Sequence, residues 1–188
     1  MTISPPEFET TPIDGLVVMR AKLVTDDRGI VREAYRSSAV AEAGITPLER
    51  IVQVNVTETR PGAVRGIHAE DMTKLVGVAA GEGLGVYVDL RNGSATRGVV
   101  HSVELVAGVH VLVPRGVGNG FQAVGPTPAQ YLYCFDEEWQ PGMAGSAVTP
   151  LDPALGIDWP VPIDAADRSL ISEKDANAPT LAEVLAAG

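Results

Sequence analysis

The sequence predicts an all-β fold, either a sandwich or a barrel, in a single domain. Runs rich in β-branched and aromatic residues recur at residues 51–56, 74–80, 84–91, 99–105, 109–113, 121–124 and 130–135. Glycine and proline occupy nearly every gap between these runs, and no helical pattern separates them. Many short strands with turn residues between them are typical of sandwiches and barrels. A chain of 188 residues fits one such domain with a substantial core.

Composition excludes several classes of protein. Charged residues make up 20% and hydrophobic residues 45% of the chain, which is ordinary for a soluble globular protein. A net charge of −10 argues against a nucleic-acid partner, because phosphate contacts need clustered lysine and arginine. The single cysteine, Cys134, cannot build a disulfide framework, and we expect it in the core. Neither a signal-peptide pattern nor an 18-residue apolar run is present, so we expect a cytoplasmic protein without a membrane partner.

The first fifty residues predict an extended arm, two strands and a short helix. Residues 1–15 carry three prolines and predict an extended arm with little regular structure. Residues 15–24 and 30–35 predict two strands joined by a turn at residues 26–29. Residues 37–43 predict a short connecting helix, capped by Ser37 or Ser38 and ended by Gly44.

The C-terminal segment, residues 141–188, is expected to be loop-rich. Turn-forming residues are dense over residues 141–162, which predicts an ordered loop over the barrel. Residues 180–187 predict a small helix with Thr180 as its cap.

Residues 51–56 alternate valine with polar residues. Valines fill the even positions, while Gln53 and Asn55 share the other face of the expected strand. In one interpretation the valines enter the core and the polar face meets solvent. In the other, the sheet is cupped and the polar face lines a binding cavity. The pattern allows both.

Basic residues gather at residues 64–74, in a turn between two expected strands. This stretch contains Arg65, His68 and Lys74 in a strongly acidic chain that has only three histidines. We interpret His68 as a candidate catalytic base, although a lone histidine near a strand is more often structural. Lys74 either stabilises an oxyanion or ends a strand in water.

Two kinds of site could contain His68, a metal site and an acid–base site. A metal site of the cupin type needs about three imidazoles and a carboxylate, two of the imidazoles usually one residue apart. His101 and His110 lie in different runs from His68, so we expect no metal. A histidine base acting alone needs an orienting partner and an acid across the substrate. Tyr131 and Tyr133 share a strand face, and either supplies that acid or packs as a sheet aromatic.

An ordered set of motifs resembles the dTDP-4-dehydrorhamnose 3,5-epimerase family. The matching stretches run from about residue 25 to residue 181, and include Asp27-Arg-Gly with Glu33, Gln53-Val-Asn55, Arg65-Gly-Ile-His68, Lys74-Leu-Val, Val88-Asp-Leu-Arg91, Val113-Pro-Arg-Gly116, Tyr131-Leu-Tyr133, Trp139-Gln-Pro141 and Ser172-Glu-Lys-Asp175. Each is weak alone, but their order and spacing are specific. The resemblance implies that residues 1–188 form one jelly-roll cupin barrel with short peripheral helices.

The resemblance also implies which residues are catalytic. His68 takes the role of the base, and Asp175 orients and charges it across 107 positions of sequence. Tyr133, rather than Tyr131, falls where the family has its catalytic acid. Lys74 would stabilise an enolate oxygen. The implied reaction is a cofactor-independent epimerisation at C3, C5 or both of a nucleotide-linked 4-keto-6-deoxy sugar, most simply a dTDP sugar, in a homodimer.

Further positions match substrate-binding residues of the family. Two of them hold the nucleotide, often from the neighbouring subunit, and an aromatic residue stands beside the base. The match also favours a cavity for the polar face of residues 51–56. The binding residues implied in this way are Arg28, Glu33, Gln53, Asn55, Arg65, Asn119 and Trp139.

The chain departs from the family pattern around the expected pocket. Asn119 stands where the family usually has a histidine, and an amide cannot transfer protons at neutral pH. Ile30 and Val31 replace phenylalanines, Ala69 and Glu70 replace an aromatic residue and a glutamine, and the loop that follows is about four residues short. The alternative function is therefore an altered cupin that binds a nucleotide sugar without 3,5-epimerisation. A metal-dependent cupin is the third hypothesis.

Overall fold

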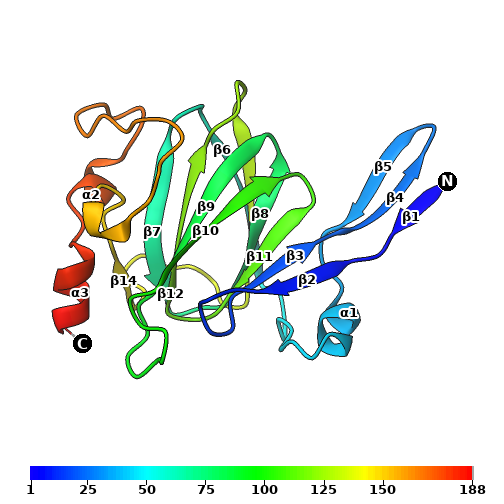
Figure 1. The fold of residues 1–188 in the computed structure, drawn as a ribbon, viewed down its shortest axis with the longest axis horizontal. Coiled ribbons are helices and arrows are strands. Elements are labelled where there is room, and N and C mark those ends of the chain that lie inside the picture. The colour runs from blue at the N-terminus through cyan, green and yellow to red at the C-terminus, as the bar shows by residue number, and fades with distance from the viewer. Residues whose placement is uncertain (188) are drawn as a thin grey trace.

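The structure, a computed structural model, describes residues 1–187 and contains two facing antiparallel sheets and a third that projects from them (Figure 1). In spatial order, the six-stranded sheet contains β2 (Glu7–Thr10), β3 (Val17–Arg20), β11 (Val109–Val113), β8 (Lys74–Ala80), β13 (Ala129–Phe135) and β6 (Gln53–Thr59). The five-stranded sheet contains β10 (Val100–Val106), β9 (Glu82–Asp89), β12 (Val117–Ala123), β7 (Val64–Glu70) and β14 (Gly145–Ala147). The prediction of an all-β fold is confirmed.

Apolar side chains fill the space between the two large sheets. Val76 and Tyr131 of the six-stranded sheet belong to one buried cluster with Tyr87 and Phe121 of the five-stranded sheet. The rings of Phe121 and Tyr131 lie 4.2 Å apart, centroid to centroid. Each buried side chain of this size stabilises the fold by about 1.5–3 kcal/mol relative to an exposed one. This core fixes the spacing of the two walls that carry the site.

The outer faces of both sheets are also covered. Helix α1 (Ser37–Glu42) contributes Val40 to a second cluster beneath the six-stranded sheet, which includes Cys134 as predicted. The C-terminal segment covers the five-stranded sheet through η1 (Pro153–Leu155) and helix α3 (Leu181–Ala187). Because both of its faces are covered, β11 is buried at every position, including His110, instead of alternating between core and solvent.

The short helices begin partly as predicted. Thr180 caps α3, because its hydroxyl accepts a hydrogen bond from the Glu183 amide at 3.3 Å. Glu183 returns the contact by accepting from the Thr180 amide at 2.8 Å, which completes a capping box. The prediction of a serine cap on α1 is wrong, since Arg36 occupies the N-cap position. Gly44 ends that helix with a φ of +74°.

Four segments predicted as turns, loops or irregular chain contain strands, and one of them is β14, within the predicted loop at residues 141–162. Residues 64–70 form β7 and are not a turn, and the glycine-rich start of residues 117–123 belongs to β12. Gly118 and Gly120 allow close packing: a Cβ on either would lie 2.8 Å from the side chain of Ile67. The arm at residues 1–15 also contains two strands, β1 (Thr2–Ser4) and β2.

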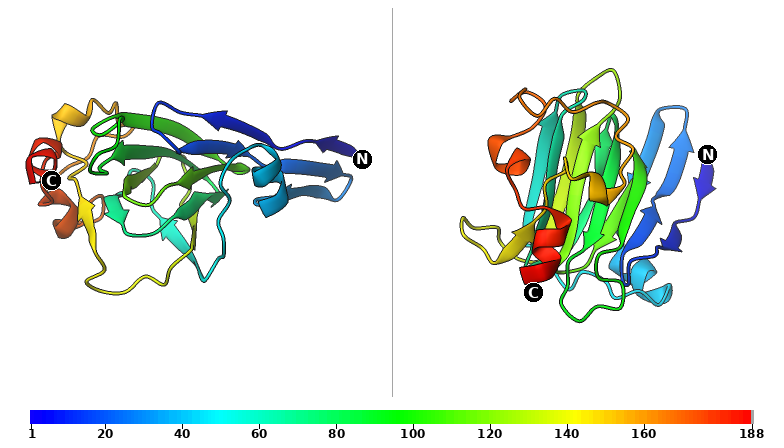
Figure 2. Two further views of the ribbon diagram at one scale, coloured as in Figure 1. Left: turned by 90° about the horizontal axis from the view of Figure 1, so that it is seen from below. Right: turned by 60° about the vertical axis from the view of Figure 1, so that its left-hand side comes forward.

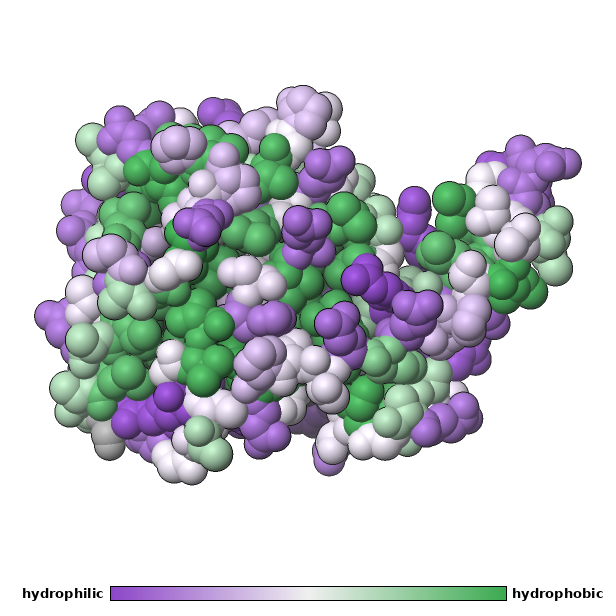
Figure 3. Space-filling model, in the orientation of Figure 1, coloured by the Kyte–Doolittle hydropathy of each residue, from purple (hydrophilic) through white to green (hydrophobic). Residues whose placement is uncertain are grey.

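The third sheet projects from the barrel at the end opposite the C-terminal helices (Figures 1 and 2). It consists of β1, β4 (Lys22–Asp26) and β5 (Gly29–Glu33). Ile3, Ile30 and Val31 on it are 53%, 48% and 67% exposed. Figure 3 shows this hydrophobic surface on the projecting part. A three-stranded sheet with exposed apolar side chains is poorly stabilised by itself.

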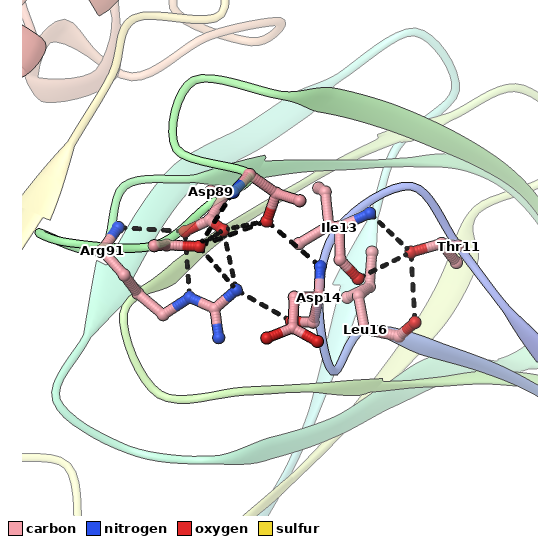
Figure 4. Close-up of polar contacts among 8 residues, drawn as sticks. Thr11, Ile13, Asp14, Leu16, Asp89 and Arg91 are labelled. Atoms are coloured by element: carbon pink, nitrogen blue, oxygen red, sulfur yellow. Dashed lines mark hydrogen bonds and ion pairs between the residues drawn. The ribbon is translucent and has the colours of Figure 1, made fainter.

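A buried polar cluster closes the barrel where β9 ends (Figure 4). The Asp89 carboxylate is fully buried and accepts hydrogen bonds from Arg91 Nη2 at 2.7 Å and from the Ser94 and Thr96 hydroxyls at 2.6 Å each. Arg91 also donates to the Asp14 carbonyl at 2.8 Å, which ties this loop to the connection between β2 and β3. Burial raises the pKa of Asp89, but these donors outweigh it and hold the pKa well below its ordinary value.

Candidate active site

A cavity of about 50 Å³ lies between the two large sheets. One wall comes from β7 and β12, and the other from β8 and β13. Gly66 permits the close approach of β7 to β12: it has a φ of +105°, and a Cβ there would lie 2.6 Å from the Asn119 carbonyl oxygen. The residues that line the cavity are Arg65, Gly66, His68, Glu70, Lys74, Asn119, Gly120, Phe121, Tyr133 and Phe135.

His68 and Asp175 form a hydrogen-bonded pair at this cavity. His68 Nε2 lies 2.7 Å from Asp175 Oδ1. Asp175 belongs to helix α2 (Glu173–Ala176), which packs on β7, and its amide donates to the Ser172 hydroxyl at 3.0 Å. Burial raises the pKa of Asp175, but hydrogen bonds from His68 and Ser172 outweigh it, so the pKa lies below its ordinary value.

The charge on Asp175 fixes the tautomer of His68. An ionised carboxylate only accepts hydrogen bonds, so Nε2 carries the proton and donates it to Asp175. Nδ1 then holds the lone pair that can accept a proton. The His68 side chain is 32% exposed, whereas that of Asp175 is 8% exposed. The pair therefore has the arrangement of a histidine base with a buried orienting carboxylate.

Tyr133 faces this pair from the opposite sheet. It lines the cavity, and its ring meets that of Tyr131 edge to face, with centroids 4.6 Å apart. Burial raises the pKa of Tyr133 to about 12, despite the opposing influence of Arg65. Tyr131 is fully buried in the core, where its hydroxyl accepts from Asn119 Nδ2 at 3.1 Å. Of the two candidate tyrosines, the structure thus brings Tyr133 to the cavity.

Lys74 enters the cavity from the start of β8. It is only 3% exposed, and its ammonium donates to the His68 carbonyl at 3.2 Å and forms an ion pair with Glu70. Burial raises the pKa of Glu70, but the charge and hydrogen bond of Lys74 bring it below its ordinary value. The interpretation that places Lys74 in water at a strand end is wrong.

Arg65 and Asn119 complete the polar lining. Arg65 Nε donates to the Thr59 hydroxyl at 2.9 Å, and its Nη2 donates to the Glu58 carbonyl at 3.3 Å. These bonds hold the guanidinium at the edge of the cavity. Asn119 is 6% exposed and stands opposite His68 in the β12–β7 register.

Three predicted binding residues lie together outside the cavity. Gln53 Nε2 donates to Asn55 Oδ1 at 3.1 Å, and the Trp139 amide donates to Gln53 Oε1 at 2.8 Å. Trp139 is 46% exposed. The interpretation that buries the valines of this strand is wrong, because Val54 and Val56 are 55% and 59% exposed.

Arg28 and Glu33 are not brought to the cavity within one chain. Both lie on the projecting sheet, whereas β7 lies beside α2 at the other end of the barrel (Figure 1). Arg28 Nη2 pairs with Asp26 at 2.6 Å, and Glu33 pairs with Arg36.

Sequence reasoning missed three side chains that line the cavity: Glu70, Phe121 and Phe135. The signal for Glu70 was available, since residues 68 and 70 share a face of any strand. It was lost because residues 64–70 were interpreted as a turn. Phe121 and Phe135 lie in predicted strands, but sequence does not say which apolar side chains border a cavity.

The described residues hold neither a metal-binding cluster nor a helix that could span a membrane. Among residues 1–187, no group of three or more His, Cys, Asp and Glu side chains is placed to hold a metal ion. No helix in the same residues is long and apolar enough to cross a membrane.

The known proteins that this chain resembles in sequence and in structure are named as sugar epimerases. Residues 10–183 match the family described as dTDP-4-dehydrorhamnose 3,5-epimerase. The chain is 35% identical to a dTDP-4-dehydrorhamnose 3-epimerase of Streptomyces niveus, over 94% of this chain and 84% of that one. The structure resembles NovW, a 4-keto-6-deoxy sugar epimerase of Streptomyces spheroides, with a TM-score of 0.86 and 33% identity over 98% and 92% of the two chains. It also resembles a 3,5-epimerase of Legionella pneumophila solved with dTDP-4-keto-L-rhamnose, with a TM-score of 0.82 and 32% identity over 96% and 97%.

Proposed function

The chain belongs to the dTDP-4-dehydrorhamnose 3,5-epimerase family, and we propose that it inverts C3, C5 or both in a nucleotide-linked 4-keto-6-deoxy sugar. The observation that carries this proposal is the arrangement of four groups around one cavity. His68 lines one wall and pairs with the Asp175 carboxylate of α2, and Tyr133 and Lys74 line the other wall. The solved relative that holds dTDP-4-keto-L-rhamnose supports a dTDP-linked substrate.

The chemistry follows from the acidity of protons beside a ketone. His68 Nδ1 removes the proton from C3 or C5, and the electron pair of the broken C–H bond moves onto the C4 oxygen. The Lys74 ammonium stabilises the resulting enolate, and Asp175 stabilises the imidazolium. The Tyr133 hydroxyl then delivers a proton to the opposite face of the carbon. Every step is a proton transfer, so the proposed reaction uses no redox cofactor.

The protonation states of the cavity suit these roles. A Tyr133 pKa of about 12 keeps the phenol protonated until the enolate reacts. A low pKa of Asp175 keeps the carboxylate charged throughout the neutral range. General acid–base steps of this kind each contribute about 10²–10⁴-fold to the rate.

The substrate extends beyond the cavity in this proposal. A volume of about 50 Å³ is far below the roughly 300–1,000 Å³ of pockets that enclose whole ligands, so only the reacting part of the sugar fits. The nucleotide would lie along Gln53, Asn55 and Trp139. We assign Arg28 and Glu33 to the same substrate in a homodimer, in which the projecting sheet of one subunit covers the site of the other.

Solvent exchange tests the proposal. Incubation with dTDP-4-keto-6-deoxyglucose in D₂O should place deuterium at C3, C5 or both, detected by NMR. Absence of exchange with this and related 4-keto sugars at high enzyme concentration would refute the proposed function. Saturable binding of an unaltered sugar would instead identify the altered, non-epimerising cupin.

A tyrosine variant tests the role of the acid. Tyr133→Phe removes the hydroxyl and should slow exchange at the two carbons unequally, if Tyr133 protonates one of them only. Tyr35→Phe is a suitable control, because its hydroxyl meets the Leu48 carbonyl at 3.4 Å, away from the cavity. Equal slowing at both carbons would contradict a carbon-specific role.

A further inference from the structure

Glu70 is a carboxylate in the cavity that the proposed chemistry does not use. Its side chain is 22% exposed and forms an ion pair with Lys74, whose side chain is 4% exposed. Each partner stabilises the charge of the other, because the charge on a buried group is poorly solvated by water. Removing one member leaves the other buried and uncompensated. The lysine at the centre of the proposed enolate chemistry thus depends on Glu70.

The geometry of the ammonium is fixed by two acceptors. Lys74 Nζ donates to the His68 carbonyl at 3.2 Å and to the Glu70 carboxylate. Within residues 1–187 these are its acceptors, so one of its three N–H groups is available to a ligand in the cavity. Because two of the N–H groups are held by these acceptors, the direction in which the third N–H points is fixed. The bond to the His68 carbonyl also joins the lysine to the strand that carries the base.

From this geometry we infer that Glu70 is a positioning residue, which holds the Lys74 ammonium and aims its free N–H at the substrate carbonyl oxygen. The inference rests on the proposed function, in which Lys74 stabilises an enolate. Glu70 itself need not touch the substrate. Its contribution is the direction of the N–H that the two acceptors leave free.

The other charged groups near the Lys74–Glu70 pair are held by partners of their own. Arg65 is held by Thr59 and Glu58, and His68 is held by Asp175. Beyond the turn at Thr73, Arg115 neutralises the outer carboxylates by pairing with Asp71 at 3.3 Å and Asp136 at 3.5 Å. The charged and titratable groups that line the cavity with Lys74 are Arg65, His68 and Glu70 on β7 and Tyr133 on β13.

A lysine-specific NMR measurement tests how firmly the ammonium is held. The chain has three lysines, Lys22, Lys74 and Lys174, so ¹⁵Nζ-labelled lysine gives few signals. In Glu70→Gln, the Lys74 ammonium protons should exchange with water at least about tenfold faster than in the wild type, because their charged acceptor is lost. Asp71→Asn removes a carboxylate one residue away that pairs with Arg115, and should leave the Lys74 signal unchanged. An identical rate of ammonium proton exchange in the wild type and Glu70→Gln overturns the inference, whether or not the enzyme acts on a sugar.

The rate of solvent exchange into the sugar gives a second readout. In Glu70→Gln, kcat at pH 7 should fall at least about tenfold while KM stays within about twofold, because the ammonium is no longer aimed at the C4 oxygen. A wild-type kcat in the variant would sink the inference and leave the proposed function standing. Absence of wild-type exchange would sink the proposed function alone.

A second variant keeps the test decisive if Glu70→Gln does not fold. Glu70→Asp retains the charge and shortens the side chain by one methylene group. The charged acceptor remains but lies farther from Lys74, so kcat should fall at least about tenfold while KM stays within about twofold. A wild-type kcat in Glu70→Asp would contradict the positional role.

Discussion

At the residue scale, the contact between His68 and Asp175 carries the catalytic proposal. Asp175→Asn keeps the size of the side chain but removes the charge that holds Nε2 protonated. We expect kcat for solvent exchange to fall by about 10²–10⁴-fold, with a much smaller change in KM. Steady-state NMR measurement of exchange gives both constants. Asp158→Asn is the matched control, because Asp158 is exposed and lies in the same C-terminal segment. Equal losses in the two variants would contradict the role of Asp175.

Individual site residues were predictable to different degrees. Family motifs identify four of them: in the structure His68, Lys74 and Tyr133 line one cavity, and Asp175 pairs with His68. The local residue pattern left two questions open: whether Lys74 lies in a site or in water, and which tyrosine is the acid. Both depend on burial, and burial depends on packing across the barrel. Glu70 was missed through an error of local structure, since a residue assigned to a turn has no defined face.

At the element scale, the connection after β9 depends on one buried carboxylate. Asp89→Asn removes the charge that Arg91 and two hydroxyls contact, and leaves the Arg91 guanidinium without its ion pair. We expect a loss of about 3–5 kcal/mol in the free energy of unfolding at pH 7, measured by chemical denaturation. Glu104→Gln, an exposed carboxylate on neighbouring β10, should change it by less than about 0.5 kcal/mol.

The same carboxylate predicts a pH dependence. The pKa of Asp89 is lower in the folded protein than in the unfolded chain, so its stabilisation is fully present above the unfolded pKa, near 4. It is lost as the pH falls below that value toward the lower folded pKa. The difference in stability between the wild type and Asp89→Asn should therefore shrink from pH 5 to pH 3. A difference that stays constant over this range would contradict the assignment.

Strand prediction succeeded where apolar residues dominated the run and failed where glycines recurred at every second position. Residues 74–80 and 109–113 agree with β8 and β11 at both ends. Residues 117–120 were interpreted as a gap, because glycine usually marks a turn. In the structure, Gly118 and Gly120 instead make room for Ile67 between adjacent strands. A single sequence shows the glycine but does not show whether it forms a turn or makes room for a side chain of the neighbouring strand.

At the scale of the whole molecule, the projecting sheet predicts complementation between subunits. Mixing the inactive variants Arg28→Ala and His68→Ala should restore activity, up to about one intact site per mixed dimer, if Arg28 serves the partner's site. Activity is measured by solvent exchange after subunits have re-equilibrated, and sedimentation velocity checks that both variants are dimers. If Arg28 serves its own site, every site in the mixture keeps one defect and activity stays at the level of the separate variants.

The all-β class and helices α1 and α3 followed from periodicity and turn residues, and the barrel followed from the family resemblance, whereas the position of the projecting sheet did not. Its exposed Ile30 and Val31 look like core positions of a local hairpin in sequence. Only contacts between distant segments decide whether such a sheet folds back on the barrel or stands away from it.

The hydrogen bond between His68 and Asp175 joins two distant parts of the chain. The strands that line the cavity end with β13 at Phe135, whereas α2 lies further along the chain. In the proposed mechanism, the carboxylate that orients the base therefore comes from outside the two large sheets. Detachment of α2 from β7 would leave both cavity walls in place and remove the partner of His68.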